Sequence, residues 1–155
     1  MSFSAYQAVV SAPTFSLGLR CSDDEILSID YLEPRAPVAP QALLAKEAVR
    51  QLRAYFDDPA FVFSLPLAPA GTGFQRRVWG GIAGIPRGQT RTYGALAQSL
   101  GSAPRAVGNA CGANPYPLVV PCHRVVAAHG LGGFARNRGG FLLDVKRWLL
   151  AHEGV

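Results

Sequence analysis

Acidic residues are scarce in the second half of this 155-residue chain. Residues 71–155 contain only Asp144 and Glu153, against ten arginine and lysine residues, whereas residues 1–70 contain eight acids and five basic residues. All but two of the 15 basic residues are arginine. A basic, arginine-rich half is typical of proteins that bind a phosphate backbone, and it favours a nucleic-acid partner over the alternative of a merely solvated basic surface.

Cysteine and histidine are scarce as well. The three cysteines, Cys21, Cys111 and Cys122, contain no C-x-x-C pair, and their odd number argues against a disulfide framework. We therefore expect a reducing compartment and a cytoplasmic location. The three histidines lack zinc-ligand spacing, and no glycine-rich loop has the lysine of a phosphate-binding loop after it, so we expect neither a metal nor a cofactor.

Long apolar runs are also missing. No stretch reaches the roughly 18 apolar residues that a membrane span needs, and residues 1–6 lack the basic start and apolar core of a signal peptide. We expect no membrane partner. The length suits one compact domain or two small lobes that share a core.

The fold class is predicted to be α+β. Short, roughly alternating segments at residues 6–10, 15–19 and 26–31 predict antiparallel strands, and residues 41–56 have the apolar spacing of a helix. We therefore expect a small N-terminal α/β lobe over residues 1–65. It contains no cluster of titratable groups, so we interpret it as a scaffold.

A mainly helical lobe is predicted for residues 66–155, because the charge balance changes sign near a Pro- and Gly-rich stretch. Thr72 and Gln75 form a capping-box pattern at the start of one helix. Thr92 is placed to cap a helix over residues 93–100, and Ser102 to cap another over residues 103–112.

The two short helices predict a helix-turn-helix, since a glycine turn joins them. An apolar strand at residues 118–120 and a glycine-rich loop at residues 130–140 are expected next. The last predicted helix spans residues 141–152.

The most reactive pattern in the chain is Cys122 followed by His123, flanked by Pro121 and Arg124. A thiolate is the reactive form of cysteine, and a neighbouring histidine can generate it near neutral pH. Glu153 ends the last helix, where a carboxylate opposes the helix dipole, so it is a candidate to orient His123. The alternatives are a buried structural cysteine at a strand end and a frayed surface glutamate.

The helix over residues 105–112 is rich in alanine and glycine, and it begins with Arg105. Glycine within a helix lowers helix stability by about 1 kcal/mol relative to alanine, so the glycines of this helix call for an explanation. One reason is close packing inside the protein. The other, which we favour, is a helix that lies in a nucleic-acid groove.

The sequence resembles the O6-alkylguanine-DNA alkyltransferases, or methylated-DNA–protein-cysteine methyltransferases, over about residues 66–154. Residues 1–65 match only in length and coarse pattern. The resemblance rests on Gly71-Thr72-x-Phe74-Gln75-x-x-Val78-Trp79, Thr92-Tyr93-x-x-Leu96-Ala97, Arg105-Ala106-Val107-Gly108, Asn114-Pro115-x-Pro117-x-x-x-Pro121-Cys122-His123-Arg124-Val125 and Lys146-x-Trp148-Leu149-Leu150-x-His152-Glu153.

This resemblance implies direct-reversal DNA repair on double-stranded DNA bearing O6-alkylguanine, with O4-alkylthymine as a second candidate substrate. Cys122 would accept the alkyl group once, irreversibly, after His123 removes its proton through a water and Glu153 orients His123. Tyr93 would donate a proton toward N3 of the departing guanine, and Asn114 would brace the turn before the active-site strand. No cofactor is implied, and we expect a monomer.

The resemblance also implies a DNA-binding set and a base pocket. The target base must be flipped out to reach a buried thiol, and Arg105 would fill the gap in the stack. The other implied DNA-binding residues are Ala106, Gly108, Asn109, Thr92 and Arg124. The implied pocket residues are Pro117, Val125, Phe134 and Ala135.

The chain departs from the family pattern in the loop after the cysteine. Relatives usually carry a tyrosine–serine pair there, where this chain has Phe134-Ala135, and residues 136–140 form a longer segment. Two rival functions use the same residues. One is a thiol hydrolase, for which the sequence offers no oxyanion hole, and the other is a lesion-recognition protein that transfers poorly.

Overall fold

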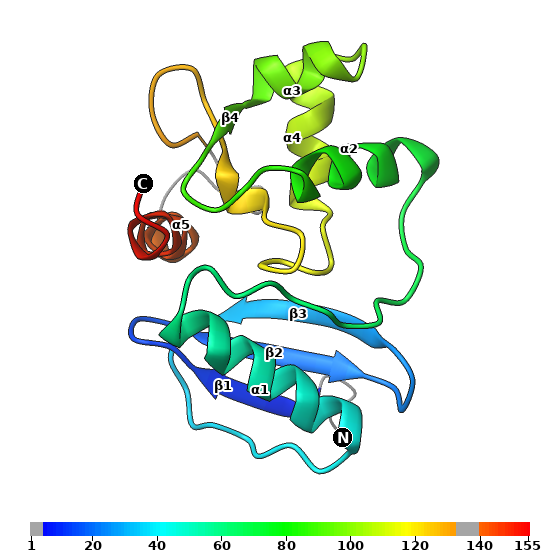
Figure 1. The fold of residues 1–155 in the computed structure, drawn as a ribbon, viewed down its shortest axis with the longest axis vertical. Coiled ribbons are helices and arrows are strands. Elements are labelled where there is room, and N and C mark those ends of the chain that lie inside the picture. The colour runs from blue at the N-terminus through cyan, green and yellow to red at the C-terminus, as the bar shows by residue number, and fades with distance from the viewer. Residues whose placement is uncertain (1–4, 133–139) are drawn as a thin grey trace. The chain divides into compact units, whose positions relative to one another are not determined.

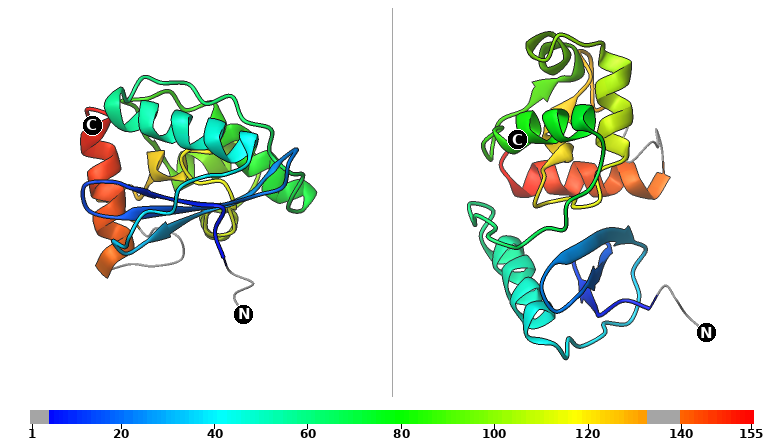
Figure 2. Two further views of the ribbon diagram at one scale, coloured as in Figure 1. Left: turned by 90° about the horizontal axis from the view of Figure 1, so that it is seen from below. Right: turned by 90° about the vertical axis from the view of Figure 1, so that its right-hand side faces the viewer.

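The computed structural model describes residues 5–132 and 140–155. The chain divides into two compact units, Met1–Pro69 and Ala70–Val155, and each is described by itself (Figures 1 and 2). Within the described residues, no helix is both long enough and apolar enough to cross a membrane.

The first unit is a three-stranded antiparallel sheet with one helix packed on it (Figure 1). Its strands are β1 (Ala8–Ser11), β2 (Ser16–Cys21) and β3 (Ile26–Leu32), paired in the order β1-β2-β3, and its helix is α1 (Leu43–Asp57). Leu17 and Leu19 of β2 are fully buried, as are Leu52 and Tyr55 of the helix. Alternating apolar residues in the strands and helical spacing in α1 thus form one core.

The second unit contains most of the helices. Among its described residues, the sheet is a parallel pair of β4 (Arg91–Thr92) with β5 (Val125–Val126). Its helices are α2 (Gly73–Ala83), α3 (Tyr93–Ser99), α4 (Pro104–Gly112), the 3₁₀ turn η1 (Cys122–Arg124) and α5 (Gly140–His152). The predicted α+β class, a small antiparallel sheet followed by helices, is therefore confirmed.

Two of the three predicted helix caps in this unit are confirmed. Thr72 and Gln75 form a reciprocal capping box on α2, and Thr92 Oγ1 accepts a hydrogen bond from Ala95 N at 3.0 Å on α3. The predicted cap at Ser102 is wrong, because α4 begins one residue later than expected. Pro104 occupies the first turn, where its fixed φ and missing N–H suit a helix start, and Ala103 becomes an N-cap without a side-chain bond.

The apolar strand predicted before Cys122 is also wrong. Residues 118–119 form a turn and Val120 makes only an isolated bridge with Pro117, with Val120 N bonded to Tyr116 O at 2.8 Å and Leu118 at a φ of 74°. Pro115, Pro117 and Pro121 lack the N–H donors that a strand ladder requires, which explains why no strand forms. Consequently Cys122 begins a short 3₁₀ turn, and the strand β5 follows the cysteine instead of preceding it.

Candidate active site

Cys122 is held at the first position of η1 and is only 4% exposed. Its Sγ accepts a hydrogen bond from Asn114 Nδ2 at 3.2 Å, and the same amide group donates to Val120 O at 2.9 Å. Asn114 Oδ1 in turn accepts from Tyr116 N at 2.9 Å. Asn114 therefore fixes both the thiol sulfur and the turn that leads to it.

His123 and Glu153 form a buried pair. His123 Nε2 lies 2.8 Å from Glu153 Oε2, and each side chain is at most 1% exposed. The carboxylate also accepts from Arg124, at 2.8 Å from Nε to Oε1 and at 3.1 Å from Nη2 to Oε2. Glu153 is thus neither frayed nor at the surface, and its orientation is set by two residues of η1.

The electrostatics of this pair favour a neutral imidazole. Burial lowers the pKa of His123, against the opposing effect of the Glu153 carboxylate, and Arg124 and Lys146 lower it further. His123 Nδ1 is buried and has no hydrogen-bond partner among the described residues. A neutral histidine with Nε2 held by a carboxylate presents Nδ1 as a proton acceptor.

A second thiol and a lysine act electrostatically on Cys122, and neither is among the catalytic residues predicted from the sequence. Interaction with Cys122 lowers the pKa of the Cys111 thiol in α4 and raises that of Cys122, and the charge of Lys146 acts on both thiols. Lys146 is fully buried, and its Nζ donates to Val125 O at 2.8 Å. Burial lowers the pKa of Lys146 to about 8, although the two thiols oppose the shift.

Tyr93 completes this cluster at the start of α3. The Lys146 Nζ lies 5.7 Å from the centre of the Tyr93 ring. Burial raises the pKa of Tyr93, and the two nearby thiols raise it further. The phenol is therefore protonated at neutral pH. Parallel pairing of β4 with β5 brings Thr92 beside Val126, which is how α3 comes to start near η1.

The α4 helix presents small or polar residues on its exposed side. Arg105 and Asn109 are exposed, while Ala106 and Gly108 are half-buried. A Cβ added at Gly108 would meet no atom of the described residues within 4 Å. The buried face packs inward, where Trp79 Nε1 donates to Ala110 O at 2.8 Å. Close packing among the described residues therefore does not explain Gly108.

The remaining predicted residues are placed as follows. Pro117 and Val125 are buried, and Thr92 caps α3. The guanidinium of Arg124 is bonded to Glu153 and, through Nη1, to Ile85 O at 2.7 Å. Phe134 and Ala135 lie outside the described residues.

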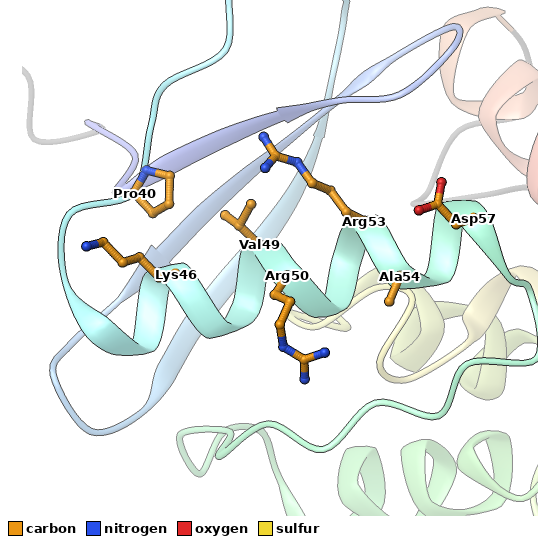
Figure 3. Close-up of a pocket in the computed structure, with 7 residues that line it drawn as sticks. All are labelled: Pro40, Lys46, Val49, Arg50, Arg53, Ala54 and Asp57. Carbon is orange, nitrogen blue, oxygen red and sulfur yellow. The ribbon is translucent and has the colours of Figure 1, made fainter.

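The first unit carries a groove of about 490 Å³ along α1 (Figure 3). No cysteine, histidine or tyrosine lines it, so its chemistry differs from that around Cys122. Its lining residues are Pro40, Lys46, Val49, Arg50, Arg53, Ala54 and Asp57.

Comparison with known proteins agrees with this geometry. The family described as 6-O-methylguanine DNA methyltransferase, DNA binding domain, matches residues 73–155. A methylated-DNA–protein-cysteine methyltransferase of Methanosarcina acetivorans is 37% identical over 158 aligned positions, covering 96% of this chain and 98% of that protein. One of Shigella flexneri is 48% identical over 108 positions, covering 67% of this chain and 60% of that protein.

Solved structures show the same likeness. The crystal structure of Mycobacterium tuberculosis O6-methylguanine methyltransferase is 36% identical, with a TM-score of 0.78, and covers 94% of this chain and 90% of that one. The same organism's OGT in complex with DNA is 37% identical, with a TM-score of 0.76 and the same coverage.

Proposed function

This chain belongs to the O6-methylguanine-DNA methyltransferase family, and on that premise we propose that Cys122 is the residue that takes the alkyl group. Members of the family are methylated-DNA–protein-cysteine methyltransferases, and this chain is one of them. It binds DNA and repairs it by direct reversal, moving the alkyl group from O6-alkylguanine to a cysteine of its own. The transfer is irreversible, so each molecule acts once.

The observation that carries the assignment is the placement of the Cys122 sulfur. It is buried, held by Asn114, and next in sequence to a neutral histidine bonded to a buried carboxylate. A sulfur lone pair forms the S–C bond, and the C–O6 electron pair leaves with guanine. His123 Nδ1 receives the thiol proton through a water, while Glu153 orients the ring.

Tyr93 supplies the proton for the departing base. Its phenol is protonated at neutral pH, and it belongs to the same cluster as the two thiols. A proton delivered toward N3 lets guanine leave as a neutral molecule, which lowers the barrier to C–O6 cleavage. In this proposal Pro117 and Val125 line the base pocket together with Phe134 and Ala135, which lie outside the described residues.

Double-stranded DNA bearing the lesion is the proposed substrate, with O4-alkylthymine as a second possible lesion. The α3–α4 pair acts as a helix-turn-helix, with α4 in the minor groove, where Gly108 and Ala106 let the backbone approach. Arg105, Asn109, Thr92 and Arg124 contact DNA, Arg124 from its position beside Glu153. The target base is flipped out, since a stacked base cannot reach a buried sulfur. The protein acts as a monomer in the cytoplasm.

Arg105→Ala should slow transfer from duplex DNA by about tenfold to a hundredfold, because the extrahelical state loses the side chain that fills the stack. Reaction with free O6-benzylguanine should stay near the wild-type rate. Stopped-flow or quench measurements of both reactions give the comparison. Arg147→Ala is the control, since Arg147 is exposed and bonded to Asp144 on α5. Equal slowing of both reactions by Arg105→Ala would exclude the finger role.

Gly108→Leu should leave the fold intact and weaken duplex binding by about tenfold. Leucine is a better helix former than glycine, and the position is open among the described residues. The added side chain would hold α4 away from the groove, at a cost of about 1–2 kcal/mol. Gly80→Leu in α2 is the matched control, because its Cβ would also meet nothing within 4 Å of the described residues. Equal affinities for both variants, measured by fluorescence anisotropy, would contradict the placement of α4.

A further inference from the structure

Lys146 is a buried cation to which the transfer steps above assign no part. It lies on α5 and is fully buried, as are its helix neighbours Val145 and Leu149. Moving an ammonium group from water into such apolar surroundings is unfavourable unless nearby groups compensate its charge. The groups that surround Lys146 therefore indicate what the cation can do.

Two groups on different elements approach the ammonium. Lys146 Nζ donates to Val125 O at 2.8 Å, and it lies over the Tyr93 ring, 5.7 Å from the ring centre. At that distance a cation is attracted to the electron-rich face of an aromatic ring. Val125 directly follows η1, which begins with Cys122, and Tyr93 is the first residue of α3. Lys146 thus connects the segment that carries the nucleophile with the phenol that we assign as the proton donor.

The position of the Tyr93 ring relative to this cation is fixed by the fold. Parallel pairing places Thr92 opposite Val126, and Thr92 caps the helix that Tyr93 begins. A Cβ built on Gly132 would lie only 3.0 Å from Tyr93 Cε2, so the Gly132 backbone lies close against the edge of the ring. Strand pairing, the cap and this close contact together restrict movement of the phenol away from the ammonium.

Proton transfer from Tyr93 creates a charge that requires a counter-ion. When the phenol gives its proton to the base it becomes a phenolate, and burial disfavours an anion at this place. Lys146 is mostly protonated at pH 7, since its pKa is about 8. Arg124 also belongs to this site, but its guanidinium is already bonded to Glu153. The Lys146 ammonium is therefore the cation placed to balance the phenolate.

We propose that Lys146 is a positioning residue for alkyl transfer: its ammonium holds the Tyr93 phenol at the start of α3 and balances the negative charge that the phenol develops as it protonates the base. This inference rests on the proposed function, in which Cys122 accepts the alkyl group and Tyr93 supplies the proton.

The atoms and charges balance without a further reactant. A lone pair of the Cys122 sulfur forms the S–C bond, and the C–O6 electron pair leaves with guanine. The Tyr93 proton moves to N3, its electron pair stays on the phenolate oxygen, and His123 holds the thiol proton. The phenolate then faces the Lys146 ammonium, and the imidazolium faces the Glu153 carboxylate. Each new charge therefore has a partner of opposite sign.

Lys146→Met tests this role, because methionine keeps an unbranched side chain and removes the charge. Single-turnover methyl transfer from duplex DNA should slow by about tenfold to a hundredfold. Thermal unfolding shows how far the loss of the bond to Val125 O affects the fold, and rates are measured well below the transition. Arg147→Met is the matched control, since Arg147 is the exposed neighbour on the same helix and should react at the wild-type rate.

A double-mutant cycle with Tyr93→Phe separates action through the phenol from a structural role. Phenylalanine keeps the ring and removes the proton, so Lys146→Met should slow the Tyr93→Phe protein by no more than about threefold. Duplex DNA with O6-methyl-3-deazaguanine, which has a C–H in place of N3, should likewise react with the wild type and Lys146→Met at rates within about threefold. The full slowing by Lys146→Met in either case would overturn the proposal and leave Lys146 a structural residue.

Tyr93→Phe by itself keeps this test distinct from the proposed function. Transfer by Tyr93→Phe at the wild-type rate would reject Tyr93 as the proton donor, and the Lys146 role with it. A slow Tyr93→Phe together with an unaffected Lys146→Met would reject the Lys146 role alone. Mass mapping of the methylated peptide should place the methyl group on Cys122 in Lys146→Met as in the wild type. A methyl group on any other residue of both proteins would reject Cys122 as the acceptor, and the Lys146 role that rests on it.

Discussion

Cys122→Ala should reduce methyl transfer to the uncatalysed background, because it removes the sulfur that we propose forms the S–C bond. The sulfur that Asn114 holds is removed, while the backbone of η1 is retained. Loss of a small buried side chain should cost only about 1 kcal/mol of folding stability. Transfer is measured with duplex DNA carrying a labelled O6-methyl group.

Binding provides the internal control for this variant. The affinity of Cys122→Ala for duplex DNA should match that of the wild type, since phosphate contacts depend on the arginine-rich second half. In both proteins the affinity should fall steeply with salt. Residual labelled methyl on the variant would show that Cys122 is not the sole acceptor, and Cys111 would then be the next residue to replace.

Glu153→Gln should slow transfer by at least about a hundredfold and destabilise the fold by about 3 kcal/mol. The carboxylate is buried and bonded to both His123 and Arg124, so its neutral replacement leaves the Arg124 guanidinium without a counter-charge. At this chain length the melting temperature should fall by roughly 10 °C. Thermal unfolding and single-turnover rates at a temperature well below the transition separate the two effects.

Asp144→Asn is the matched control, because Asp144 is the other acid of the second unit. Its side chain is exposed and pairs with Arg147 three residues away, an arrangement that contributes about 0–1 kcal/mol. Stability and transfer should both stay close to wild type. If Glu153→Gln behaved like Asp144→Asn, the buried cluster would contribute nothing to orienting His123.

Local patterns predicted much of this molecule because they depend on neighbours in sequence. The strands of the first unit, the capping box of Thr72 and the cap of Thr92 were all predicted from short-range chemistry. A carboxylate at a helix C-terminus opposes the helix dipole, and this identifies Glu153 as a candidate site residue. In the structure it bonds to both His123 and Arg124. The predicted helix cap at Ser102 is wrong for a local reason too, because α4 begins at Pro104, one residue later than predicted.

The thiol pair and the lysine could not be predicted in this way. Cys111 and Cys122 influence each other across the turns around Pro115 and Pro117, an arrangement that no periodicity encodes. Lys146 follows the apolar Val145 on α5, and its full burial depends on the Val125 carbonyl and the thiols opposite. A lysine beside an apolar helix face is the one signal that could have identified it. Arg124 was expected at DNA, and its observed bonds to Glu153 and Ile85 arise from long-range packing.

The most direct test of the account is peptide-level mass spectrometry after a single incubation of the full chain with excess O6-methylguanine duplex DNA. We expect one methyl group per protein molecule, located on Cys122, together with unmodified Cys21 and Cys111 and restored guanine in the DNA. A product that keeps forming beyond one equivalent, or a methyl group on any other residue, would contradict the account.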